Sequence, residues 1–143
     1  MKIRVVAVGP LKQRAARELT DEYFGRVKRY CAFEEIEIKA SSKLERSIDK
    51  AVEGAQVVAL DPAGKTLDSA DFARRLERLA SHGKGIVAFL IGGADGLPKA
   101  NVNAAHERWS LSALTFPHRL ARVVLAEQLY RAMTILRGEP YNK

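Results

Sequence analysis

The chain has 143 residues, of which 47% are hydrophobic and 29% are charged, and its formal net charge is +7. This length and composition predict a single domain over residues 1–143 that is large enough to bury its own core. The longest apolar run is far too short for a transmembrane helix. A single cysteine, Cys31, excludes an internal disulfide and a cysteine-rich metal site.

The charge and the first residues of the chain narrow the class of protein further. A pI near 9.8 leans toward a polyanionic partner such as nucleic acid, although many basic proteins bind none. Arg4 interrupts the short apolar run near the N-terminus, and no small-residue cleavage site follows it. We therefore expect no signal peptide and a cytoplasmic protein.

The first part of the chain is predicted to alternate strands with helices. Branched apolar residues fill 2–8, and apolar positions recur at helical spacing over 13–30, with the charged residues on a solvated face. Alternation over 33–38 predicts a second strand. A short amphipathic helix over 44–52 and a fully apolar third strand over 56–60 follow.

The second part continues this alternation. Asp68 or Ser69 is predicted to cap a helix that ends before Gly83, and a fourth strand covers 86–91. This order predicts the α/β class, with a mostly parallel sheet, helices on both faces and right-handed crossovers. A last helix over 118–137 is apolar on more than one face, which indicates a central helix or one shared with another subunit.

Two unusual segments lie between residues 85 and 117. Gly92, Gly93 and Gly96 follow the fourth strand, and the loop 109–117 is apolar and rich in hydroxyl groups. Ligands of α/β sheets bind beyond the carboxyl ends of strands. The glycine spacing fits neither a dinucleotide fingerprint nor a P-loop, so the turn is either structural or a cradle for a neutral, adenine-like ligand.

Taken one at a time, the other candidate residues give weaker evidence of a functional site. His82 is predicted to face solvent, and His106 is predicted to be a structural residue in a charged helix. His118 begins the last helix, and no histidine spacing indicates a metal site. Trp109 is more often a core residue than a base-stacking one, and Tyr141 either folds over a site or is disordered.

Several long motifs together resemble the RlmH family of SPOUT-class methyltransferases, which act on 23S rRNA. They are LIGGADGL at 90–97, WSLSALTFPHRLARVVLAEQLYRA at 109–132 and RGEPYNK at 137–143. The N-terminal KIRVVAVG and the strand end at 59–61 fit as well. The resemblance therefore spans the whole chain.

The resemblance implies a fold, a partner and a reaction. The expected fold has a C-terminal trefoil knot, and the expected assembly is a homodimer that binds neither membrane nor metal. The expected cofactor is S-adenosylmethionine, and the expected substrate is N3 of a pseudouridine in 23S rRNA of the large subunit or assembled ribosome. The implied cofactor contacts are Leu60, Gly92, Leu111, Ser112, Ala113, Leu114, Thr115 and Phe116.

Three residues near the implied cofactor site are the candidates for catalysis. By position, His118 is the candidate base, Arg122 supports a developing anion or a phosphate, and Tyr141 holds the target base. Family members often have histidine where this chain has Asn142, so a titrating side chain is not expected there.

Two other functions compete with this interpretation. The first is a non-enzymatic RNA-binding module that uses the basic surface without binding S-adenosylmethionine. The second is an unknotted nucleotide-binding α/β protein such as a flavodoxin-like carrier. The missing phosphate loop and the apolar segment 109–117 argue against the second.

Overall fold

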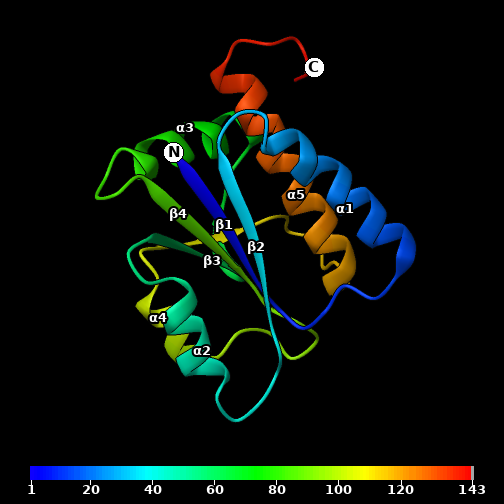
Figure 1. The fold of residues 1–143 in the computed structure, drawn as a ribbon, viewed down its shortest axis with the longest axis vertical. Coiled ribbons are helices and arrows are strands. Elements are labelled where there is room, and N and C mark those ends of the chain that lie inside the picture. Colours follow the sequence, from blue (N-terminus) through cyan, green and yellow to red (C-terminus); the bar gives the residue numbers. More distant parts are fainter. Residues whose placement is uncertain (143) are drawn as a thin grey trace.

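A five-stranded sheet forms the centre of the molecule in the computed structural model, which describes residues 1–142 (Figure 1). The strand order is β2-β1-β4-β3-β5, and every neighbouring pair is parallel. The strands are β1 (Lys2–Val8), β2 (Ala32–Ile38), β3 (Gln56–Thr66), β4 (Ile86–Ile91) and β5 (Glu107–Ser110). The helices are α1 (Arg14–Val27), α2 (Leu44–Ala51), α3 (Ser69–Ala80), α4 (Lys99–Ala104) and α5 (His118–Leu136).

Helices cover both faces of this sheet, which confirms the predicted fold class. The larger core cluster joins α1, α3 and α5 to one face, and the smaller one joins α2 and α4 to the other. In β1, Val5 packs in the first cluster and Val6 in the second, because successive side chains of a strand point to opposite faces. A strand covered on both faces must be apolar throughout, which is the pattern seen in β4.

Helix α5 is the central helix of its layer. It contacts both α1 and α3, and Leu125, Leu129 and Met133 are buried. The apolar surface around this helix is therefore explained, at least in part, by packing within the chain. A shared face with a second subunit stays a prediction.

Strand β3 is longer than its sequence pattern indicated. It was expected to end at Leu60, but pairing with β5 resumes at Lys65 after an irregular register. The intervening backbone passes so close to β5 that a Cβ on Gly64 would lie 2.7 Å from the carbonyl carbon of Arg108. Residues 61–65 include a proline and a glycine and have the composition of a turn, so the local pattern does not indicate this second stretch of strand.

Two further predictions in this region were wrong in detail. Residues 109 and 110 belong to β5 rather than to a loop, and Trp109 is only 2% exposed. The core interpretation of that tryptophan is therefore confirmed. His106 lies between α4 and β5 rather than in a helix, and its Nδ1 accepts a hydrogen bond from the backbone of Val57 at 2.9 Å. A fixed backbone contact, rather than helical position, gives that imidazole its structural role.

The carboxyl ends of three strands lie level with one another. Val8 pairs with Ile38, and Ala7 pairs with Ile91, so β1, β2 and β4 end at one edge of the sheet. The loops that follow them gather at the lower end of the molecule in Figure 1, where α5 also begins. No helix within residues 1–142 is long and apolar enough to cross a membrane.

Candidate functional site

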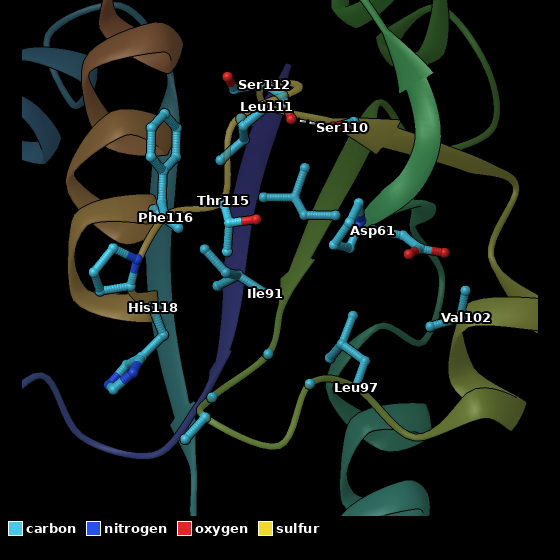
Figure 2. A pocket seen from close by; sticks show the side chains of 18 of the residues that line it. Asp61, Ile91, Leu97, Val102, Ser110, Leu111, Ser112, Thr115, Phe116 and His118 are labelled. Atoms are coloured by element: carbon cyan, nitrogen blue, oxygen red, sulfur yellow. Dashed lines mark hydrogen bonds between the residues drawn. The ribbon is translucent and has the colours of Figure 1, made fainter.

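A cavity of about 760 Å³ opens at this carboxyl edge of the sheet (Figure 2). One wall is the turn after β4, and the facing wall is the segment that joins β5 to α5. The end of the first stretch of β3 and part of α4 close the remaining side. The lining includes residues 60–62, 91–94, 96–97 and 110–118.

The turn after β4 is built from backbone with almost no room for side chains. The amide of Gly96 donates to the carbonyl of Gly93 at 3.0 Å, and Gly96 has a φ of +74°. A Cβ on Gly92 would lie 2.6 Å from the carbonyl carbon of Gly96, and one on Gly93 would lie 3.1 Å from the carbonyl oxygen of Val8. Glycine is required at Gly92 because the turn closes against itself there.

The facing segment is held by its own hydroxyl groups. Ser110 Oγ donates to the carbonyl of Ser112 at 2.8 Å, and Ser112 Oγ accepts from the amide of Leu114 at 2.9 Å. Figure 2 shows Leu111 and Thr115 directed toward the middle of the cavity. Leu114 also borders the cavity, and it is 73% exposed. The two hydrogen bonds shape a loop that presents apolar groups to a ligand.

The structure places all the predicted cofactor residues in the wall of this cavity. They are Leu60, Gly92, Leu111, Ser112, Ala113, Leu114, Thr115 and Phe116. Their contact with a cofactor stays a prediction. Sequence reasoning missed Ile91, Leu97 and Val102, which line the same space (Figure 2). The sequence position of Ile91, as the last apolar residue before the glycines, could have indicated that it lines the cavity. Val102 reaches the cavity only through the packing of α4.

The three predicted catalytic residues lie in different surroundings. His118 is exposed and lines the cavity at the start of α5. Arg122 lies one turn further along α5 and is 2% exposed. Its guanidinium donates to the carbonyl of Gly9 at 2.9 Å, to Glu35 at 2.9 Å and to Glu37. The charge of Arg122 is thus compensated by two carboxylates behind the cavity wall.

Tyr141 lies at the other end of α5. Its hydroxyl donates to Glu127 at 2.7 Å, and its ring packs edge-on against Tyr130 with centroids 4.6 Å apart. The guanidinium of Arg131 covers the ring at 4.9 Å and also donates to Asn142 at 3.0 Å. Burial and the hydrogen bond to Glu127 raise the pKa of Tyr141 well above its usual value. The tail therefore packs against α5, and in Figure 1 the C-terminus lies at the opposite end of the molecule from the loops that follow β1, β2 and β4.

Within the described residues, no three histidine, cysteine or carboxylate side chains are placed to hold a metal ion together. The cavity instead offers apolar side chains and the bare backbone of a glycine turn. Such walls suit a mostly apolar ligand whose polar edge pairs with main-chain groups.

Comparisons with known proteins agree with this geometry. A family profile described as "Predicted SPOUT methyltransferase" matches residues 1–142. The chain is 57% identical over 143 residues to the Ribosomal RNA large subunit methyltransferase H of Sorangium cellulosum, covering 99% of each chain. It is 47% identical over 154 residues to the protein of the same name from Anaeromyxobacter dehalogenans, covering 100% of each.

Solved structures share the fold at low sequence identity. A probable methylase family protein from Haemophilus influenzae matches with a TM-score of 0.62 and 13% identity, over 99% of this chain and 70% of that one. A probable methyltransferase from Bordetella pertussis also has a TM-score of 0.62, with 17% identity over 92% and 93% of the two chains. From the profile and the full-length relatives together, the chain belongs to the SPOUT methyltransferase family.

Proposed function

We propose that this protein methylates N3 of a pseudouridine in 23S rRNA of the large ribosomal subunit, with S-adenosylmethionine as methyl donor. One observation carries the proposal: the residues that the RlmH resemblance assigns to the cofactor converge on one cavity. The relatives named Ribosomal RNA large subunit methyltransferase H match over nearly their full length, which supports rRNA as the substrate. Such a reaction takes place where ribosomes are assembled, in the cytoplasm.

The cavity fits the proposed donor in chemistry and size. Leu60 and Leu111 provide apolar side chains in the wall for an adenine ring, and the turn at Gly92 leaves backbone groups uncovered. A volume of about 760 Å³ lies in the range of small-molecule pockets. S-adenosylmethionine supplies a methyl group that is already activated, so the chain itself has to bind, align and deprotonate.

His118 is the residue that we propose as the proton acceptor. It lies at the border of the cavity with its side chain exposed, so an incoming base can approach the imidazole. A histidine in this place can take the N3 proton as the new bond to carbon forms. We propose that Arg122 acts from behind the wall as a positioning residue. Glu35 and Glu37 compensate its charge and keep it out of the cavity, so it holds the start of α5, which carries His118, rather than facing the developing anion.

Tyr141 requires a second copy of the chain for the role that we propose. About nine residues of helix separate Glu127, its partner, from His118, and this corresponds to roughly 14 Å along α5. In a homodimer, the tail of one protomer could hold the target base at the cavity of its partner. We also propose the trefoil knot for residues around the cavity, as the resemblance implies.

The test is methyl transfer to purified large ribosomal subunits and to assembled ribosomes, with labelled S-adenosylmethionine. We expect label in 23S rRNA at one pseudouridine, mapped by nuclease digestion and mass spectrometry. Calorimetry with S-adenosylmethionine separates the alternative of a non-enzymatic RNA-binding module, which binds RNA but not the donor. Donor binding without label in either particle would overturn the proposed substrate.

A further inference from the structure

Five cations lie in the segments that follow the strands at the carboxyl edge of the sheet, where the cavity opens. Lys12 follows β1, Lys39 and Lys43 follow β2, Lys99 begins α4, and Arg119 lies in the first turn of α5. We call these five residues the basic rim. All five side chains are exposed, and among the described residues none has a carboxylate oxygen within 4 Å.

The register of the sheet places the segments that follow β1, β2 and β4, and with them part of the basic rim, at one level. Because Val8 pairs with Ile38 and Ala7 with Ile91, the segments that carry Lys12 and Lys39 leave the sheet level with the glycine turn. Neighbouring strands lie about 4.8 Å apart, so the end of β2 is only about 10 Å from the end of β4.

Two side-chain contacts bring the remaining parts of the basic rim together. Asn101 Nδ2 donates to the carbonyl of Glu45 at 3.2 Å and to Asp49 at 2.9 Å, and so joins the start of α4 to α2. Lys99 and Lys43 each lie two residues before one of these joined positions. On the other side, the hydrogen bond from Arg122 to Gly9 holds the segment before Lys12 against α5, close to Arg119.

The basic rim differs from several arginines on the helices, which pair with carboxylates of the same chain. Arg14 pairs with Glu18, Arg26 with Glu22, and Arg75 with Glu107 across to β5. Those charges are compensated locally, whereas the charge of the basic rim is left for an external anion. Two acidic residues also lie at this edge, Asp95 in the glycine turn and Asp61 in the lining of the cavity.

We propose that the basic rim is the docking surface for the phosphate backbone of the rRNA whose base enters the cavity. This inference rests on the proposed function, because the cavity must receive an RNA base. The nucleotides on either side of that base then cross the carboxyl edge, where the basic rim lies. Lysine and arginine contacts to phosphate fix the position of an RNA without reading its sequence, and they add salt-dependent affinity.

The test compares two double variants with the wild type. Lys39→Ala/Lys43→Ala removes two cations of the basic rim that do not line the cavity. Lys28→Ala/Lys84→Ala is the matched control, because these two lysines are exposed, have no carboxylate within 4 Å in the described chain, and lie at the opposite edge of the sheet. For each protein, KM for large ribosomal subunits and the affinity for a labelled 23S rRNA hairpin are measured across a salt series.

If the basic rim binds the RNA backbone, we expect a change in Lys39→Ala/Lys43→Ala and none in the control variant. The KM of the first variant should rise several-fold with kcat and S-adenosylmethionine affinity unchanged, and its plot of log affinity against log salt should be shallower by about 1.5, from two lost phosphate contacts. Equal slopes in the wild type and the first variant, or the same change in both variants, would overturn the inference. If the wild type transfers no methyl group, the proposed function fails. The hairpin titration then still tests whether the basic rim binds RNA.

Discussion

The guanidinium of Arg122 donates a hydrogen bond from Nη1 to the carbonyl oxygen of Gly9 at 2.9 Å, across 113 positions of the chain. Its Nη2 reaches Glu35 and Glu37, and both carboxylates also bind Arg17. One buried side chain thus joins α5 to the carboxyl ends of β1 and β2, directly behind the cavity. The first turns of α5 are held in place by this network.

Replacing Arg122 with alanine should therefore lower stability. Removing one partner of a buried ion pair typically costs about 3–5 kcal/mol, and we expect the lower end, about 3 kcal/mol, because Arg17 still neutralises the two carboxylates. Urea denaturation measures this loss. Arg14→Ala, which breaks an exposed pair with Glu18, is the control and should cost under about 1 kcal/mol. Equal losses in the two variants would show that the buried network contributes no more to stability than an exposed ion pair does.

Gly92→Ala should damage donor binding. The added Cβ would lie 2.6 Å from backbone of the same turn, so the turn has to move. Distortions of this kind cost about 1–3 kcal/mol, which corresponds to an affinity for S-adenosylmethionine that is weaker by about 5- to 150-fold. Calorimetry makes the measurement. Gly25→Ala in α1 is the control: a Cβ there meets nothing within 4 Å, so we expect intact binding and up to about 1 kcal/mol of added stability. Unchanged affinity in Gly92→Ala would place the donor elsewhere.

His118→Ala should lower turnover without weakening donor binding. A positioned general base typically contributes about 10²–10⁴-fold, so kcat should fall within that range. His82→Ala is the matched control, because His82 is exposed at the end of α3, away from the cavity, and we expect wild-type kcat for it. Wild-type turnover in His118→Ala would remove that residue from the mechanism.

The contact between the C-terminal tail and α5 should weaken in acid. Burial raises the pKa of Glu127, but hydrogen bonds from Arg131 and Tyr141 outweigh it, and the pKa lies below its ordinary value of 4.5. A lowered carboxyl pKa stabilises the folded state above about pH 4.5, and this contribution is lost as the pH falls through the folded-state pKa. The measurement is the free energy of unfolding between pH 6 and pH 3, a range that extends about 1.5 units on either side of the ordinary pKa.

Glu127→Gln provides the comparison for this pH series. The amide cannot titrate, so the variant should lose less stability than the wild type as the pH falls. Glu77→Gln, at an exposed position of α3, should retain the wild-type slope. Parallel curves for the wild type and Glu127→Gln would mean that this carboxylate does not link the tail to the fold.

Much of the fold could be predicted because the strands and helices have strong local patterns. The apolar strands β1 and β4 and the capped start of α3, where Asp68 accepts from the amide of Asp71 at 2.7 Å, lie where the sequence indicated. The end of β3 was missed because its pairing with β5 is long-range and its residues have the composition of a turn. The role of Arg122 was missed in part for the same reason, since Glu35 and Glu37 come together with it only in the folded chain.

The candidate site, like the fold, could be predicted only where a local pattern in the sequence indicates it. The glycine turn and the apolar segment 109–117 stood out in the sequence because their composition is unusual for loops. The contribution of α4 depends on its contact with α2 through Asn101, and no local signal in the sequence indicates that contact. The place of Tyr141 is set by Tyr130 and Glu127, which are separated from it by the end of α5.

The measurement that tests the central claim most directly is mass spectrometry of 23S rRNA after incubation of large ribosomal subunits and assembled ribosomes with the protein and deuterated S-adenosylmethionine. We predict one labelled methyl group, at N3 of a single pseudouridine, in at least one of the two particles, and a much smaller yield with Gly92→Ala under the same conditions. An unlabelled pseudouridine in both particles, with a wild-type protein that binds the donor, would contradict the account.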